Sequence, residues 1–193
     1  SVTLGLVVGG LLGAAAAFYS GKTDNIIMRT MDILIALPSF LLAIAIAAAL
    51  GPSMLNVIVA IAFGSIPNYA RVTRASILTV KDLEYIEAAR AIGSNDRRII
   101  FKHLIPNALA PIIVQATLGV AGAIISAAGL SFIGLGVQPP TPEWGAMLSA
   151  GKQYIRTNWN IVTFPGLTIM LSVFALNLLG DGLRDALDPK MKR

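Results

Sequence analysis

The chain has 193 residues, of which 55% are hydrophobic and 13% charged, with a mean hydropathy of +0.74 and a formal net charge of +5. A soluble domain has roughly 45–50% apolar and about 25% charged residues, so this composition excludes an ordinary soluble protein and indicates one embedded in a bilayer. The sequence has no Cys, which excludes disulfides, thiolate nucleophiles and Cys-based metal sites, and its single His, His103, cannot form a metal site alone.

The first predicted element is an uncharged helix over about residues 2–19, which ends before Lys22. A helix rises about 1.5 Å per residue and the hydrocarbon core is about 30 Å thick, so a run of this length can cross it. Gly5, Gly9 and Gly13 recur at every fourth position. They predict a helix face on which a neighbouring helix approaches closely.

The second and third spans are predicted within residues 33–70, which carry no charge. Gly51-Pro52-Ser53 interrupts this stretch and is a strong turn signal, so the two spans should form a tight hairpin. Just before the stretch, Arg29 and Asp32 lie three residues apart. This helical spacing favours a local ion pair.

Residues 84–106 form a charged stretch between long uncharged ones. Its first part predicts a short amphipathic helix that ends at Gly93, because apolar residues recur at helical spacing while Glu84, Glu87 and Arg90 occupy other faces. The apolar positions are Leu83, Ile86, Ala89 and Ile92.

A second short helix is predicted after Gly93, with Ser94-Asn95-Asp96 as its cap and Pro106 at the entry to the next span. Its apolar side consists of Ile99, Ile100, Phe101 and Leu104. Two short helices joined by a glycine make a knob that fits a groove in a partner protein. The alternative is an amphipathic loop that lies on the membrane surface.

The fourth and fifth spans are predicted over about residues 107–128 and 161–180, separated by an outer loop over 138–160. All five spans should be helices, since backbone groups in lipid must be satisfied within the segment. Gly119 and Gly122, with Ser126 near them, either pack against a neighbouring helix or line a translocation path. Polar side chains within the spans either bond between helices or line a pore; they are Ser39, Asn56, Asn68, Gln115, Thr117 and Asn177.

The distribution of basic residues predicts the orientation. With alternating loops, residues 22–29, residues 71–102 and the C-terminal tail share one side of the membrane. Of the 15 Lys and Arg residues, only Lys152 and Arg156 fall on the other side. The positive-inside rule therefore places the 84–106 loop and the C-terminus in the cytoplasm.

The pattern Glu87-Ala88-Ala89-x-x-x-Gly93, followed by an apolar tract that ends in Pro106, resembles the EAA loop of permease subunits of bacterial ABC importers. The resemblance implies that these residues couple the chain to a cytoplasmic ATPase. Glu87 would pair with a basic residue of the ATPase, Ala88 and Ala89 would permit close approach, and Gly93 would make the bend.

The match to the EAA pattern is incomplete before its last proline. The family pattern carries Ile and Leu there, whereas this chain has His103 and Ile105. Three other stretches, residues 29–38, 130–147 and 177–189, are similar to the C-type permease of the dipeptide, oligopeptide and nickel group.

The resemblance covers almost the whole chain and implies an all-α integral membrane fold, that of type I ABC importer permeases, with six spans in the full-length protein. Residues 1–193 are then a single permease domain with five spans, truncated at its N-terminus. The start at Ser1 inside an apolar run, without a Met, also indicates a fragment.

The resemblance implies a transport subunit of the bacterial inner membrane that has no chemistry of its own. Its partners would be a B-type permease, two ATPase subunits that bind the ATP, an extracytoplasmic substrate-binding protein and membrane lipid. No cofactor, catalytic residue, metal site or nucleic acid partner is expected. The cargo stays open between a dipeptide, a longer peptide, a glutathione-like compound and nickel or another small solute.

Two other classes of membrane protein, a secondary transporter and a channel subunit, are alternatives to an ABC importer subunit. A secondary transporter usually needs an ionisable group near the middle of the membrane, and the only acid near a span core, Asp32, lies at an edge. A channel subunit remains an alternative, and it does not need the knob.

Overall fold

The structure is a computed structural model that describes residues 1–187, and these residues form helices joined by short turns. The all-helical prediction is thus confirmed for the described part of the chain. The end of the predicted inner tail, residues 188–193, lies outside the described residues. In chain order the elements are α1 (Val2–Tyr19), α2 (Gly21–Ile35), α3 (Ser39–Leu50), α4 (Met54–Leu78), α5 (Glu84–Ala91), α6 (Asp96–Arg98), the π-helix η1 (Ile99–Leu104), α7 (Ile105–Asn107), α8 (Leu109–Phe132), α9 (Trp144–Gly151), the 3-10 helix η2 (Lys152–Tyr154) and α10 (Asn160–Leu187).

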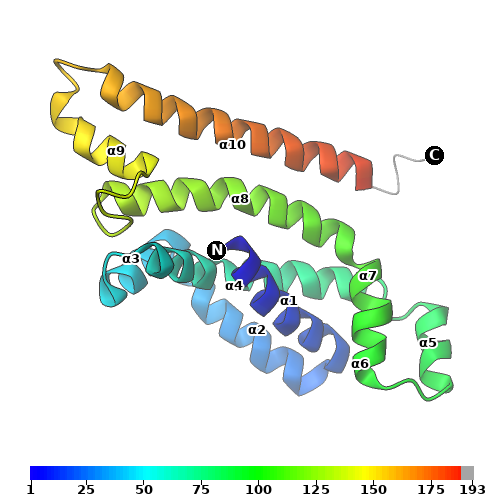
Figure 1. Cartoon of the computed structure of the whole chain (residues 1–193). Coiled ribbons are helices and arrows are strands. Elements are labelled where there is room, and N and C mark those ends of the chain that lie inside the picture. Colours follow the sequence, from blue (N-terminus) through cyan, green and yellow to red (C-terminus); the bar gives the residue numbers. More distant parts are fainter. Residues whose placement is uncertain (188–193) are drawn as a thin grey trace.

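The first helix, α1, has the predicted bounds and packs its glycine face along α4 (Figure 1). A Cβ atom added at Gly9 would lie 2.5 Å from the backbone oxygen of Ile66, and one added at Gly13 would lie still closer to the backbone oxygen of Ala70. Since both obstacles are backbone atoms, no side-chain rotation can relieve the clash. The prediction of close helix approach at these glycines is therefore confirmed.

The second predicted span is broken. Helices α2 and α3 meet at an angle of 83° across residues 36–38. Pro38 precedes the first residue of α3, and a proline disfavours the helical conformation of the residue before it, so α2 cannot run on. The 12 residues of α3 reach only about 18 Å. The hairpin predicted at Gly51 is present, with a φ of 86°, but one of its arms is this short helix.

Among the described residues, four helices are long and apolar enough to cross a membrane, namely α1, α4, α8 and α10. The bent pair α2 and α3 makes a fifth span if it is counted as one. The predicted total of five spans is consistent with this arrangement. The last two spans run further than predicted, to Phe132 and Leu187.

The outer loop contains a helix, α9, that its Gly- and Pro-rich sequence does not predict. The carboxylate of Glu143 caps this helix by accepting a hydrogen bond from the backbone N–H of Ala146 at 2.7 Å. Gly145 lies so close to α8 that an added Cβ would collide with the backbone of Ala128. The helix therefore forms where the end of α8 supports it.

The loops gather at two ends of the molecule, as the alternating topology predicts. Figure 1 shows α5, α6 and α7 at one end, together with the α1–α2 connection and the described end of α10. Helices α3 and α9 lie at the opposite end. The 84–106 loop therefore sits at the end that carries most of the described basic residues.

Candidate functional site

The 84–106 loop is folded back onto the ends of α1 and α4. Ile86 has no exposed surface, and Ile99 and Leu104 from the second part of the loop are equally enclosed. These side chains belong to one apolar cluster that also contains Ala17 of α1 and Ile77 of α4. Burial of apolar surface thus fixes the loop to two membrane helices.

The turn of the loop has the predicted conformation. Gly93 has a φ of 77°, a left-handed conformation that a glycine adopts at little cost, and a Cβ added there would meet no other atom within 4 Å. The backbone N–H of Ser94 bonds to the carbonyl oxygen of Ala89 at 3.1 Å, which closes the end of α5. The side-chain oxygen of Asn95 accepts a hydrogen bond from the N–H of Arg98 at 2.9 Å and caps α6, as predicted.

The outward face of α5 differs from the predicted pattern at both ends. Ile86 and Ala89 are buried as expected, but Leu83 is 44% exposed and Ile92 is 83% exposed. The reason is that Leu83 precedes the helix and Ile92 follows it, so neither follows the helical periodicity. The apolar side chain of Ile92 is therefore exposed directly beside Gly93.

The five residues of the EAA-like pattern lie on two sides of the loop. Glu87, Ala88 and Gly93 are exposed, whereas Ala89 is 6% exposed and faces the rest of the chain. Pro106 is exposed in the first turn of α7, directly after the π-helix. Only one of the two alanines is thus presented outward.

Two ion pairs join α2 to α4 near the same end. The guanidinium of Arg74 binds both carboxylate oxygens of Asp24, each at 2.6 Å, and Arg71 binds Asp32 at 2.6 Å. The predicted pair between Arg29 and Asp32 is therefore wrong. Helix α2 lies along α4, and this packing gives Asp32 a partner on the neighbouring helix.

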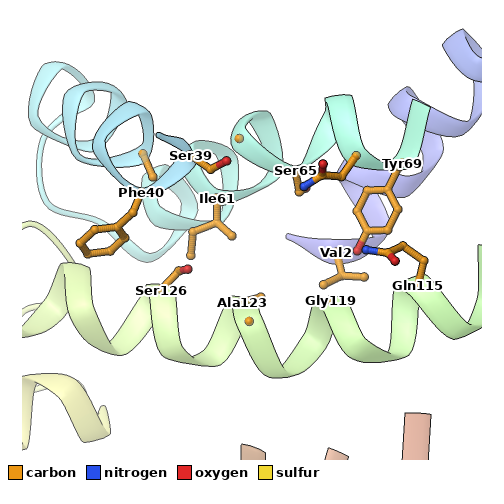
Figure 2. Close-up of a pocket in the computed structure, with 14 residues that line it drawn as sticks. Val2, Ser39, Phe40, Ile61, Ser65, Tyr69, Gln115, Gly119, Ala123 and Ser126 are labelled. Atoms are coloured by element: carbon orange, nitrogen blue, oxygen red, sulfur yellow. The ribbon is translucent and has the colours of Figure 1, made fainter. Parts of the chain in front are cut away.

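A cavity of about 220 Å³ lies between α1, α3, α4 and α8 (Figure 2); its lining is mostly apolar, and we call it the polar cavity after the six polar side chains that reach it. Three of the polar residues singled out in the sequence, Ser39, Asn68 and Gln115, line it. All of its lining residues are uncharged. Ser126, which the sequence places near Gly119 and Gly122, lines it too, and sequence reasoning missed two further polar side chains of the cavity, Ser65 and Tyr69.

The spacing along α4 and α8 contains the signal for this cavity. Ser65 and Asn68 lie three apart on α4, and Gln115, Gly122 and Ser126 recur on α8 at helical spacing. A search for polar and small residues that share one face of each helix would have found them.

The other candidate pore residues have different places. Asn56 donates to the carbonyl oxygens of Leu50 and Gly51, each at 2.9 Å, and so closes the α3–α4 hairpin. Thr117 donates to the carbonyl of Ile113 within its own helix. Neither residue lines the cavity, and Asn177 is not among its lining residues either.

The two glycines singled out in α8, Gly119 and Gly122, differ in how closely a neighbour packs against them. A Cβ added at Gly119 would collide with the hydroxyl of Tyr69, so this glycine makes room for a neighbour. A Cβ added at Gly122 would meet nothing within 4 Å, and this residue lines the cavity. Both glycines line the cavity, and Gly119 in addition packs closely against Tyr69, so the lining alternative fits both and the packing alternative fits Gly119 alone.

A second, larger cavity of about 680 Å³ lies nearer to the 84–106 loop. It is bounded by the inner parts of α4 and α8 and by the end of α10, and its polar lining includes Ser76, Asn107 and Arg184.

Residues 5–193 match the family described as "Binding-protein-dependent transport system inner membrane component". The di/tripeptide transport system permease protein DppC of Pseudomonas aeruginosa is 54% identical over 192 residues, which cover 100% of this chain and 63% of that protein. The glutathione transport system permease protein GsiD of Pectobacterium atrosepticum is 50% identical over 192 residues, covering 100% of this chain and 64% of that protein. The chain thus spans a little under two thirds of the length of these relatives.

The arrangement of helices is also shared with solved structures. A chain of the MetNI methionine ABC transporter in an inward facing conformation superimposes with a TM-score of 0.77 at 21% identity, covering 97% of this chain and 89% of that chain. A chain of an amino acid ABC transporter superimposes with a TM-score of 0.63 at 15% identity, covering 96% and 88%. These likenesses show a common fold.

Proposed function

This chain belongs to the family of inner membrane components of binding-protein-dependent transport systems, and we propose that it forms part of the membrane path of an ATP-driven importer of short peptides. In this proposal the chain moves its cargo without chemistry of its own. ATP is bound and hydrolysed by partner subunits, which act on the membrane helices through the 84–106 loop.

The observation that carries the proposal is the division of α5 into an inner and an outer face. Ile86 and Ala89 hold the inner face, while Glu87 and Ala88 are exposed and the adjoining Ile92 is 83% exposed. A carboxylate and an exposed apolar side chain on the same short loop provide both a charge and an anchor for a partner's groove. We infer that Glu87 pairs with a basic residue of the ATPase and that Ala88 permits close approach.

The turn and the end of the loop have supporting roles in this proposal. Gly93 lets the chain reverse sharply from α5 into α6. Pro106 follows the π-helix and lies at the first turn of the segment that leads into α8. Motion of the loop would therefore pass directly into a membrane helix.

The family's description supports the remaining partners. It names inner membrane components of binding-protein-dependent systems, so we propose a second permease subunit, two cytoplasmic ATPase subunits and an extracytoplasmic binding protein. The basic residues on the loop and the neighbouring helix ends support a cytoplasmic position for this end.

The cargo class rests on the relatives and on the cavity. The relatives named above are a di/tripeptide and a glutathione permease protein, whose printed cargoes share the amide bond. Asn68 and Gln115 in the cavity each offer a donor and an acceptor, and Ser39 and Ser126 offer hydroxyls. These groups match the N–H and C=O of a peptide backbone, and we propose that they line part of its path.

The proposal is tested by reconstituting the full-length subunit with its permease partner, ATPase subunits and binding protein in vesicles. We expect uptake of a labelled dipeptide that requires ATP and all partners. Uptake of a nickel chelate but not of peptides would replace the proposed cargo. Solute flux through the subunit without ATPase would indicate a channel and contradict the proposal.

Two matched variants test whether the cavity is part of the peptide path. Gly122→Leu fills the cavity, and Gly182→Leu adds the same side chain on α10, where an added Cβ also meets nothing within 4 Å. We expect Gly122→Leu to slow peptide uptake at least fivefold and Gly182→Leu to leave it within twofold. Equal effects of the two variants would remove the cavity from the path.

A further inference from the structure

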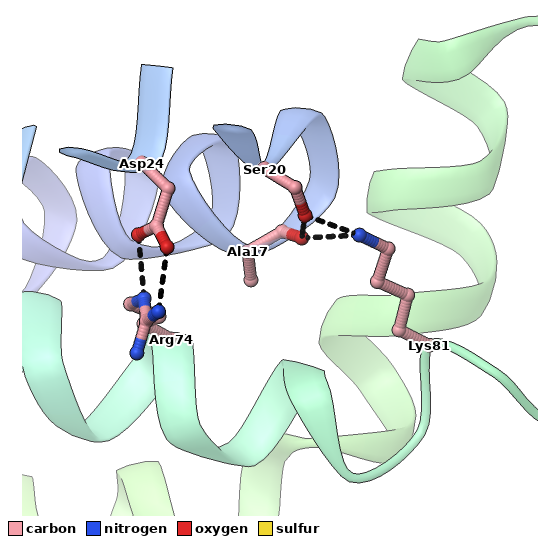
Figure 3. Close-up of polar contacts among 5 residues, drawn as sticks. All are labelled: Ala17, Ser20, Asp24, Arg74 and Lys81. Carbon is pink, nitrogen blue, oxygen red and sulfur yellow. Dashed lines mark hydrogen bonds and ion pairs between the residues drawn. The ribbon is translucent and has the colours of Figure 1, made fainter. Parts of the chain in front are cut away.

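The end of α1 is bound by a residue that lies just before the 84–106 loop. The ammonium of Lys81 donates hydrogen bonds to the carbonyl oxygen of Ala17 at 2.8 Å and to the hydroxyl of Ser20 at 2.6 Å (Figure 3). The Ser20 hydroxyl in turn donates to the same carbonyl at 3.2 Å. Lys81 therefore holds the last turn of α1 from a segment far along the chain.

This contact lies where the backbone leaves its ordinary conformation. Ser20 and Gly21 both have a φ of 54°, and the chain reverses there from α1 into α2. The last carbonyls of a helix lack partners within the helix, and its C-terminal end carries a partial negative charge. A lysine ammonium satisfies one such carbonyl and complements this charge, so Lys81 stabilises a strained connection.

Two further contacts surround the α1–α2 corner, which we define as residues 17–24. The guanidinium of Arg90, on α5, lies 5.6 Å from the centre of the Phe18 ring. On the other side of the corner, Arg74 of α4 binds Asp24 with two hydrogen bonds (Figure 3). The corner is thus fixed to the segment before the loop, to the loop itself and to α4.

Apolar contacts also join the α1–α2 corner to the 84–106 loop. Ala14 and Ala17 of α1 share a buried cluster with Ile86, Ile99 and Leu104 of the loop. The loop therefore cannot shift relative to the α1–α2 corner without breaking both polar and apolar contacts. Helix α10, by contrast, packs against α8 and α9.

We propose that Lys81 is a positioning residue that locks the α1–α2 corner to the 84–106 loop, so that movement of the loop enters the membrane domain through α1 and α2 as well as through α8. This inference rests on the proposed function, because it assigns the path by which the loop's motion spreads. The bend between α2 and α3 would then turn a shift of the corner into a shift of α3, whose first residue Ser39 lines the polar cavity.

The test is Lys81→Met in the full-length subunit, assembled with its partners in vesicles. ATP hydrolysis and dipeptide uptake are measured on the same preparation. We expect the ATPase subunits to bind and hydrolyse ATP as before, since the outward face of α5 is unchanged. The number of peptides imported per ATP should fall at least fivefold.

Two variants separate positioning from charge. Lys81→Arg keeps a cationic donor and should restore at least half of the ratio of peptides to ATP. Lys102→Met removes a lysine of the loop itself, one that is exposed on η1, and should leave the ratio within twofold. An equal loss in Lys102→Met would show that only the charge of the loop matters and would overturn the proposal.

A milder variant covers the case in which Lys81→Met does not assemble. Ser20→Ala removes one acceptor of the lysine and leaves its charge, and it should lower the ratio about twofold. An unchanged ratio in whichever of these two variants assembles overturns the role of Lys81 and leaves the proposed function standing. Absence of ATP-dependent peptide uptake in the unaltered complex would instead contradict the proposed function itself.

Discussion

Helix α1 and the most apolar 18-residue window of α10 have the same mean hydropathy, 1.9, but very different surroundings. In α1 33% of the residues are buried within the molecule, against 6% in the most apolar 18-residue window of α10. The face of α1 toward α4 is made of Gly5, Gly9, Gly13 and alanines, whereas α10 exposes large side chains such as Phe164, Leu171 and Phe174. Mean hydropathy thus indicates that a helix lies in the membrane. The size of its side chains indicates whether another helix of the same chain packs closely against it.

The largest expected effect compares the same substitution in the two helices. Gly9→Ala places a methyl group 2.5 Å from a backbone oxygen and 2.8 Å from the Cβ of Tyr69, so α1 and α4 must separate. We expect it to destabilise the protein by about 3 kcal/mol or more. The measurement is the melting temperature of the purified protein in detergent.

Gly166→Ala in α10 is the control for this comparison. An added Cβ there would have its nearest neighbour, Leu148, at an ordinary distance of 3.9 Å. Since alanine favours a helix over glycine by up to about 1 kcal/mol, this variant should be neutral or stabilising. Equal destabilisation by the two variants would contradict the difference in packing between the two helices.

A second prediction concerns the turn of the loop. Gly93→Pro cannot adopt the φ of 77° found there, because proline fixes φ near −65°. We expect ATP-dependent uptake to fall more than tenfold while the protein still inserts into the membrane. Uptake assays and membrane fractionation of the same cells check both parts.

A third prediction concerns the outward face of α5. If Glu87 forms a partly buried ion pair with an ATPase, Glu87→Ala should weaken the docking by about 2–5 kcal/mol. Glu84→Ala removes an exposed carboxylate one turn earlier on the same helix and is the matched control. Binding of the ATPase subunits to the two variants in detergent is the measurement, and equal affinities would contradict the role of Glu87.

The smallest predicted difference lies between the two ion pairs of α2 and α4. Asp24 and Arg74 have side chains 19% and 33% exposed, whereas Asp32 and Arg71 are both 48% exposed. Asp24→Asn should therefore cost about 1.5–3 kcal/mol, and Asp32→Asn less than about 1 kcal/mol. Thermal unfolding in detergent can resolve the difference, and the reverse order would contradict the greater enclosure of the first pair.

The sequence predicts features of this fold that depend on composition and local spacing. The uncharged run before Lys22 marked α1 within its observed bounds, and Gly93 and Asn95 marked the turn and cap of the loop, since each acts through its own backbone. The glycines of α1 also predicted that another helix packs closely against it, but their spacing does not identify that helix as α4.

Features that depend on distant partners could not be read in the same way. The true partner of Asp32, Arg71, lies on another helix, and α9 forms because Gly145 fits against α8. Pro38 is a local signal for the bend between α2 and α3, but the uncharged stretch around it favoured the prediction of one continuous span. The binding of Ala17 by Lys81 has no local signature, because the two residues meet only after α1 and α4 have packed.

We propose that a cytoplasmic ATPase binds the end of the molecule that carries the 84–106 loop. The most direct measurement is cross-linking of Ala88→Cys in the assembled complex, with Thr157→Cys at the opposite end as the control; both positions are exposed, and residues 1–193 contain no other Cys. We expect a covalent product between Ala88→Cys and an ATPase subunit, and none from Thr157→Cys. A product from Thr157→Cys alone, or labelling of Ala88→Cys only from the extracellular side, would contradict it.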